Sequence, residues 1–243
     1  MTNICDNFRD FIRQLTKSWQ RRGLSEEKKR RVTSSEEDDD EVERLSGRHL
    51  LSFINLSKNF GSYTAVDNLT LNLGEDQIYC LLGHNGAGKT TILNLLIGIH
   101  KPSKGTIKVG KDLDVRYDMA EIRLKLGICH QHDILFDQLS AEQHLKLLCR
   151  LKMIDSGSDS SQTIKKRVEE ILDQVSLNKD RHTLSVNLSG GMKRRLSIAM
   201  GIVAESKILI MDEPTTGLDP LVRDQIWSLI RSLKKDRCIL MTT

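Results

Sequence analysis

The chain has 243 residues, of which 38% are hydrophobic and 29% are charged, a composition that is ordinary for a globular protein of one large domain or two small ones. Its net charge of +4 is small for this length, so charge gives no reason to expect nucleic acid as a partner. No apolar run approaches the ~20 residues that a helix needs to cross a bilayer, and we therefore predict no membrane span.

The cysteines are odd in number, scattered and without a C-x-x-C pair, which argues against a disulfide framework or a zinc site. Three of them lie inside apolar runs. We therefore predict free, buried thiols in a reducing compartment. The five cysteines are Cys5, Cys80, Cys129, Cys149 and Cys238.

Residues 1–22 are predicted to form a basic amphipathic helix, because apolar residues recur at helical spacing from Ile4 to Trp19 with Arg and Lys between them. Such a helix either lies on a membrane surface or docks on the body of the protein, and the sequence does not favour one over the other. Residues 23–48 consist of blocks of charge with almost no apolar residues, which predicts a disordered linker. Within this linker, RRVT and SSEED match kinase acceptor patterns, although most such matches arise by chance.

The remaining residues, 49–243, alternate between strand and helix patterns. The region 119–176 is predicted to be mostly helical, and a further helix is expected at 222–233. Strands alternating with helices predict an α/β fold with a mostly parallel sheet and a helical insertion in its middle third. The predicted strands are 50–56, 69–73, 77–83, 105–110, 207–212 and 237–243.

The stretch GHNGAGKTT matches the P-loop pattern G-x-x-x-x-G-K-[ST] without a mismatch and lies between a predicted strand and a predicted helix. Its glycines let the backbone approach phosphates closely, Lys89 offers positive charge to the β- and γ-phosphates, and Thr90 offers a hydroxyl to Mg²⁺. The alternative is a glycine-rich turn with an unrelated lysine, which the full match and its context disfavour. The predicted ATP-binding loop is Gly83, His84, Asn85, Gly86, Ala87, Gly88, Lys89, Thr90 and Thr91.

The stretch KILIMDE at 207–213 places two carboxylates at the end of a predicted buried strand. Asp212 would hold Mg²⁺ directly or through water, and Glu213 would polarise the water that attacks the γ-phosphate. Four apolar residues before Asp-Glu are common by chance. The P-loop upstream makes the functional interpretation the stronger one.

A second helix start suited to an anion occurs at LSGGM, residues 188–192. A Ser-Gly-Gly sequence that opens a helix exposes free backbone N–H groups and the positive end of the helix dipole. Taken alone, it could equally be an N-cap with tight helix packing. One nucleotide site would be complete without it.

A P-loop, then LSGG, then MDEP about twenty residues later strongly resembles the nucleotide-binding domain of ATP-binding cassette (ABC) transporters, over roughly residues 50–243. The resemblance implies a P-loop NTPase fold of ABC type, with a mostly parallel core sheet, an antiparallel β subdomain and an α-helical subdomain at about 132–190. It also implies that two such domains face each other head to tail, so that the signature residues of one act in trans on the γ-phosphate held by the other. Those residues are Leu188, Ser189, Gly190, Gly191 and Met192, the last standing where many relatives have glutamine.

The resemblance assigns further roles. Phe60 matches the aromatic residue that stacks on adenine, with Tyr63 as a weaker candidate. Gln131 matches the glutamine that reaches Mg²⁺ and water. The implied catalytic residues are Lys89, Gln131 and Glu213, the implied metal ligands are Thr90, Gln131 and Asp212, and the implied dimer-interface loop is Gly217, Leu218 and Asp219.

In the family, the strand that matches CILMTT is followed by a histidine that contacts the γ-phosphate, whereas this sequence ends at Thr243 and none of its seven histidines takes that place. On this ground we expect a chain that is C-terminally truncated before that histidine. Loss of one charge-assisted contact to the reacting phosphate can cost ~10²–10³ in rate. We therefore expect the chain to bind ATP but to hydrolyse it poorly by itself.

The stretches HNGAGKTT, CHQHDILFDQLSAEQHL and PTTGLDPLVRDQIW look most like the A subfamily, whose members are largely associated with lipid movement. The implied function is an ATPase domain that uses ATP and Mg²⁺, pairs with a second nucleotide-binding domain and drives transmembrane domains at the cytoplasmic face of a membrane. Residues 1–22 would then be the cytosolic segment that leads from the membrane domain into the cassette. Two alternatives are a soluble ABC ATPase acting on ribosomes or DNA, and a cassette that binds ATP without efficient hydrolysis.

Overall fold

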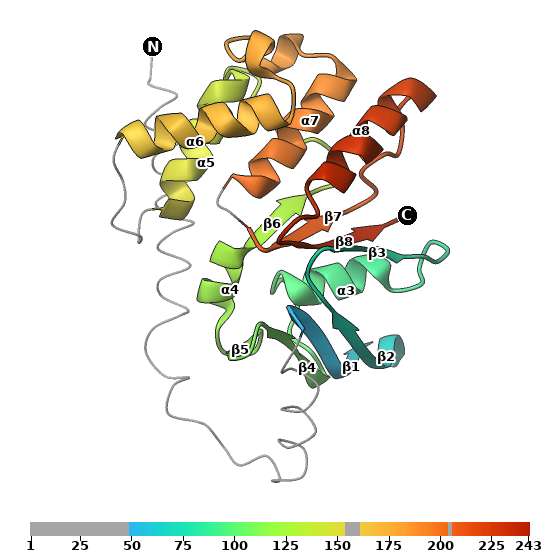
Figure 1. Ribbon diagram of the computed structural model, residues 1–243. Coiled ribbons are helices and arrows are strands. Elements are labelled where there is room, and N and C mark those ends of the chain that lie inside the picture. Colours follow the sequence, from blue (N-terminus) through green and yellow to red (C-terminus); the bar gives the residue numbers. More distant parts are fainter. Residues whose placement is uncertain (1–48, 154–160, 204–205) are drawn as a thin grey trace, which may run out of the picture.

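The computed structural model describes residues 49–153, 161–203 and 206–243, so the predicted helix at 1–22 and linker at 23–48 lie outside the described residues. Two four-stranded sheets form the scaffold (Figure 1). The parallel sheet has the order β3 (Gln77–Leu81), β8 (Cys238–Thr242), β7 (Ile208–Met211), β6 (Leu126–Cys129). The antiparallel sheet has the order β2 (Tyr63–Leu73), β1 (Leu51–Phe60), β4 (Lys104–Val109), β5 (Leu113–Asp114).

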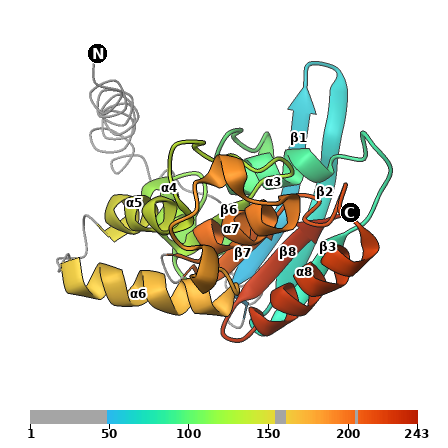
Figure 2. The same cartoon turned by 90° about the horizontal axis from the view of Figure 1, so that it is seen from above.

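Six α-helices accompany these strands in the described part of the chain. They are α3 (Lys89–Leu96), α4 (Met119–Lys125), α5 (Ala141–Met153), α6 (Ser161–Gln174), α7 (Gly190–Ile202) and α8 (Pro220–Ser232). Helices α5 and α6 lie at the opposite end of the molecule from β1 and β2, with the parallel sheet between them (Figures 1 and 2). None of the helices described is long and apolar enough to span a bilayer.

The parallel sheet separates two hydrophobic cores, and alternate residues of one strand serve each core. In β7, Ile208 and Ile210 pack with residues of α3 and of the antiparallel sheet. The intervening Leu209 and Met211 pack with residues of α5, α6, α7 and α8. Successive side chains of a strand point to opposite faces, and both faces are covered here, which explains the continuous apolar run that the sequence shows at this point.

The region 119–176 is mostly helical as predicted, with α4, α5 and α6, but it also contains a core strand that the sequence did not predict. β6 pairs in parallel with β7, from Leu126 opposite Ile208 to Cys129 opposite Met211. An apolar run of four residues directly after a helix carries too little periodicity to be separated from that helix in the sequence. The strand matters for function because Gln131 lies just beyond its end.

The predicted strand at 77–83 is shorter and less buried than expected. β3 ends at Leu81 and is the outermost strand of the described parallel sheet, so only one of its edges is covered. Cys80 is consequently exposed, which makes the prediction of a buried thiol wrong there. The prediction of free, buried thiols is confirmed for Cys129, Cys149 and Cys238, and burial raises the pKa of Cys238 to about 12. Cys5 lies outside the described residues.

Candidate functional site

The glycine-rich loop joins the end of β3 to the start of α3 and is exposed from Gly83 to Ala87. Gly88 has a φ of 88°, and a Cβ placed there would collide with the carbonyl oxygen of Ala65 in β2, so only glycine suits this position. The side chain of Lys89 folds back across the loop and donates a hydrogen bond to the carbonyl oxygen of Gly83. An exposed loop at a helix N-terminus with a lysine across it has the shape and charge that phosphates require.

Two aromatic side chains lie at the turn between β1 and β2, beside this loop. The hydroxyl of Tyr63 donates a hydrogen bond of 3.3 Å to the carbonyl oxygen of Gly86, within the loop itself. Phe60 pairs with Tyr63 across the turn and is 43% exposed, with its ring centroid 5.2 Å from that of His100. Both residues are therefore available to an adenine ring, and Tyr63, the weaker candidate in the sequence, makes the direct contact with the loop.

The acidic end of β7 lies at the same edge of the parallel sheet as the loop. The hydroxyl of Thr242 donates a hydrogen bond of 2.5 Å to Oδ1 of Asp212 and accepts one of 3.0 Å from the N–H of Glu213. The N–H of Thr243 lies 3.3 Å from the carbonyl oxygen of Leu81, which joins the end of β8 to the end of β3. The carboxyl ends of these strands thus bring Asp212 towards the start of the phosphate-binding loop.

Gln131 and Glu213 meet in front of this edge. Nε2 of Gln131 donates a hydrogen bond of 3.0 Å to Oε2 of Glu213, and the hydroxyl of Thr216 donates one of 3.1 Å to the same oxygen. Glu213 has a φ of 43°, a region that residues with side chains rarely adopt and that concentrates at functional sites. A carboxylate and an amide held together in this way can orient a water molecule and accept its proton.

The Ser-Gly-Gly sequence opens α7 as expected. Ser189 is the N-cap, and its hydroxyl oxygen accepts a hydrogen bond of 3.3 Å from the N–H of Met192. Ser189 and Gly190 are exposed, and a Cβ added at Gly190 would have no atom within 4 Å of it. Gly191 instead faces Val222 of α8, where an added Cβ would lie 2.9 Å from Cγ1. The corner thus faces solvent, where a second chain can reach it.

The loop Gly217–Asp219 lies beside this corner, because Asp219 is the N-cap of α8 and Val222 in the first turn of α8 contacts Gly191. Gly217 and Asp219 are exposed, and Leu218 is half-buried against the core. The described surface therefore carries the signature corner and the predicted interface loop side by side.

Arg194 also belongs to this region, although no sequence motif revealed it. It is 3% exposed and donates hydrogen bonds to the backbone on both sides of the Gln131–Glu213 pair. The sequence feature that could have indicated its burial is its position three residues after Gly191 and four before Ile198, on the buried face of α7. A charged residue on a buried helix face needs polar partners, and here those partners belong to the site.

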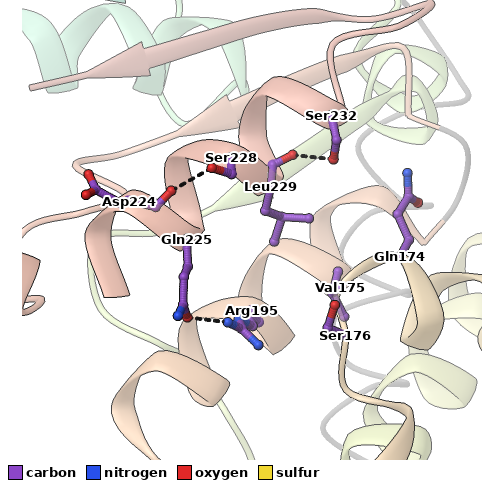
Figure 3. Close-up of a pocket in the computed structure, with 9 residues that line it drawn as sticks. All are labelled: Gln174, Val175, Ser176, Arg195, Asp224, Gln225, Ser228, Leu229 and Ser232. Carbon is purple, nitrogen blue, oxygen red and sulfur yellow. Dashed lines mark hydrogen bonds between the residues drawn. The ribbon is translucent and has the colours of Figure 1, made fainter. Parts of the chain in front are cut away.

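A groove of about 430 Å³ lies elsewhere, between the end of α6, the middle of α7 and the outer face of α8 (Figure 3). Its lining includes Arg195 and Gln225 but none of the candidate nucleotide-site residues. The groove is thus separate from the site described above.

A glycine-rich loop at the end of a parallel strand, an acidic pair at the end of a neighbouring strand and an exposed Ser-Gly-Gly helix start define a P-loop nucleotide-binding domain of the cassette type. Residues 66–216 match the family model described as ABC transporter. The chain belongs to the ABC transporter family.

The similar curated relatives include members of the A subfamily. The chain is 45% identical over 179 residues to the ATP-binding cassette sub-family A member 2 of Rattus norvegicus, an alignment that covers 74% of this chain and 7% of the relative. It is 46% identical over 178 residues to the phospholipid-transporting ATPase ABCA3 of Mus musculus, covering 73% of this chain and 10% of the relative. The chain thus spans about a tenth or less of the length of these relatives.

A similar solved structure is the dimeric MJ0796, a bacterial ABC transporter cassette. The two structures align with a TM-score of 0.68 and 25% sequence identity, over 79% of this chain and 87% of that one. The predicted fold class, an ABC-type ATPase domain with a parallel core sheet and an antiparallel sheet, is confirmed.

Proposed function

We propose that this chain is the ATP-binding and ATP-hydrolysing domain of a transporter, that by itself it binds ATP but hydrolyses it poorly, and that the ATP cycle drives transport by membrane domains. The observation that carries the proposal is the Gln131–Glu213 hydrogen bond of 3.0 Å, at the sheet edge from which the phosphate-binding loop starts. Lys89 and the exposed N–H groups of the loop would bind the phosphates, and Phe60 or Tyr63 would stack on the adenine. Glu213 would accept a proton from the attacking water, which Gln131 would orient.

Magnesium suits the donors present. This ion is usually bound through one or two protein ligands together with substrate phosphates. The hydroxyl of Thr90 in the first turn of α3 and the carboxylate of Asp212, with Gln131 near it, would be those ligands. When bound, Mg²⁺ would neutralise charge that develops on the phosphates.

A second nucleotide-binding domain would complete the site. Ser189 and Gly190 are exposed at the start of α7, where free N–H groups and the helix dipole attract an anion. The γ-phosphate on a facing copy is the anion that we propose for this corner. The dimeric arrangement named for MJ0796 supports this proposal.

The membrane domains would dock on an exposed apolar patch made of Ile134, Phe136, Leu184 and Val186. The patch is built from two segments that hydrogen bonds join, since the hydroxyl of Ser185 donates a bond of 2.8 Å to the carbonyl oxygen of Phe136. The patch follows directly after Gln131, so docking there would connect a membrane segment to the site. On this proposal the domain would work at the cytoplasmic face of a membrane, and the relative ABCA3 supports phospholipid as the substrate class.

The experiment that tests the proposal is thermal unfolding of the 243-residue chain with Mg·ATP, together with the variant Lys89→Ala. A hundredfold excess of ATP over Kd should stabilise the fold by about 2.7 kcal/mol, and the variant should lose this effect. Phosphate release, measured on the same samples, separates hydrolysis from binding. An unfolding temperature that does not respond to millimolar ATP would overturn the proposal, and rapid phosphate release by the isolated chain would contradict the slow hydrolysis that we expect of it.

A further inference from the structure

Arg194 joins three segments that carry the proposed site. It lies on α7, five residues after the N-cap Ser189, and its guanidinium is enclosed by backbone. Nε donates a hydrogen bond of 2.6 Å to Pro214, Nη1 donates one of 2.6 Å to His130, and Nη2 donates one of 3.2 Å to Glu213. Its full set of acceptors is the carbonyl oxygens of His130, Gln131, Asp212, Glu213 and Pro214 and the carboxylate of Asp133.

These contacts span the two backbone segments from which Gln131 and Glu213 extend. The guanidinium is planar and carries five N–H donors in fixed directions, so a single rigid group determines how far apart the segments lie. The carboxylate of Asp133, 3.1 Å from Nη1, compensates the buried charge. A shift of α7 therefore moves Arg194, and Arg194 moves both halves of the pair.

The exposed corner of Ser189 and Gly190 opens the same helix, little more than one turn before Arg194. Between the corner and Arg194 the chain is one continuous helix, which transmits displacement along its axis without a hinge. We infer that Arg194 is a positioning residue that couples occupation of this corner by a partner's nucleotide to the geometry of the Gln131–Glu213 pair in its own subunit. The inference rests on the proposed function and adds a route by which one nucleotide site senses the other.

The neighbouring Arg195 provides a matched control. Its Nη2 donates a hydrogen bond of 2.5 Å to Oε1 of Gln225 in α8, at the groove shown in Figure 3. It thus has the same charge and the same helix as Arg194 but contacts neither half of the pair. Arg195→Lys should change no readout that depends on coupling.

The test is a double-variant cycle on the 243-residue chain, with amide hydrogen exchange measured with and without Mg·AMP-PNP. Gly190→Asp places a negative charge at the corner, Arg194→Lys removes the fixed guanidinium, and a third variant combines the two. Protection of segment 83–88 from exchange shows that nucleotide is bound in the chain's own loop. Exchange of segments 130–134 and 213–216 reports the state of the Gln131–Glu213 pair.

In the wild type and in Arg195→Lys, we expect Gly190→Asp to speed exchange of 130–134 in the nucleotide-bound state by about 5- to 150-fold, the usual range of coupling between sites. In the Arg194→Lys background, Gly190→Asp should change the exchange rate of segment 130–134 by less than twofold. Segment 83–88 should stay protected, which would show that nucleotide is still bound. If Arg194 served only to stabilise the fold, Arg194→Lys would raise hydrogen exchange uniformly along the chain. The effect of Gly190→Asp on segment 130–134 would then be unchanged.

Equal effects of Gly190→Asp in both backgrounds would overturn the inference, and so would the absence of any effect in the wild type. Failure of the wild type to protect segment 83–88 would instead overturn the proposed function. If Arg194→Lys does not fold, Asp133→Asn takes its place, because this variant removes the compensating carboxylate charge and keeps the carbonyl contacts. It should reduce the effect of Gly190→Asp in part, and an undiminished effect would count against the inference.

Discussion

Gln131 and Glu213 are separated by 82 residues in the sequence, and their side chains lie 3.0 Å apart. They meet because β6 and β7 are parallel neighbours, so that residues following each strand emerge at the same edge. Neither side chain could be brought to the other by local structure. The contact is therefore a direct product of the sheet topology.

Glu213→Gln should abolish most ATP hydrolysis while retaining ATP binding. The substitution keeps the size of the side chain and a partner for Gln131, but it removes the base that would accept a proton. Loss of a general base costs about 10²–10⁴-fold in rate. Phosphate release gives the rate and calorimetric titration gives the affinity. Glu121→Gln, at an exposed residue paired with Lys125, is the control, and turnover of Glu213→Gln within twofold of wild type would exclude the assigned role.

Gly190→Asp should prevent nucleotide-dependent dimerisation without destabilising the single chain. The space around Gly190 is open, and a carboxylate in the first turn of α7 interacts well with the helix dipole, but it would repel a partner's γ-phosphate. Sedimentation with Mg·AMP-PNP measures dimerisation, and thermal unfolding measures stability.

Gly191→Val is the comparison for this experiment. Its side chain would collide with Val222 inside the same chain, which should destabilise the fold by about 1–3 kcal/mol. The two variants should therefore distinguish the roles of the two glycines. Gly190 would serve contact with the partner, whereas Gly191 would serve packing within the chain. Equal losses of stability in both variants would contradict this distinction.

Phe60→Ala should weaken the binding of ATP but not of inorganic tripolyphosphate. Stacking of a base on an aromatic ring contributes on the order of 1–3 kcal/mol. The phosphates alone would not use this contact, since they are proposed to bind at the loop that begins at Gly83. Titration calorimetry with both ligands provides the measurement. Equal weakening for ATP and tripolyphosphate would instead indicate that Phe60 supports the loop.

The stability of the chain should fall as pH drops below about 6.5, and His144 should be one cause. His144 is 1% exposed; its Nδ1 lies 2.8 Å from the carbonyl oxygen of Ser140, and its Nε2 accepts a hydrogen bond of 2.9 Å from the N–H of Phe136. The contact with Ser140 needs a proton on Nδ1 and the contact with Phe136 needs a deprotonated Nε2, so only the neutral ring makes both, and burial lowers the pKa of His144. The unfolded chain therefore takes up this proton first, so stability is present above the unfolded pKa and is lost as pH falls through the folded one.

His144→Gln should flatten this pH dependence, because glutamine does not titrate. Urea unfolding between pH 5 and 8, with variant and wild type compared at each pH, measures the difference. An unchanged slope in the variant would assign the pH dependence to other groups. Because Phe136 belongs to the exposed apolar patch, the wild-type patch should also become more mobile in acid.

Much of this site was predictable from the sequence because its chemistry depends on short motifs. The residues from Gly83 to Thr91 must be contiguous to form a loop and the first turn of a helix. Their pattern can therefore be recognised in the amino-acid sequence. The strand before Asp212 was recognisable for a similar reason, since burial on both faces requires an uninterrupted apolar run. The strand β6 was not recognised, because four residues show no distinct period.

The glycine-rich loop, the acidic strand end and the Ser-Gly-Gly helix start could all be predicted from the amino-acid sequence, since each is encoded by neighbouring residues and local backbone preferences. Three contacts and exposures could not be predicted in this way: Arg194 lies among the carbonyl oxygens around Gln131 and Glu213, Tyr63 contacts the loop, and Cys80 lies at an exposed edge. They depend on which strands are neighbours and on which helix face is covered. Such relationships arise from packing between segments that are far apart in the chain, and no local pattern records them.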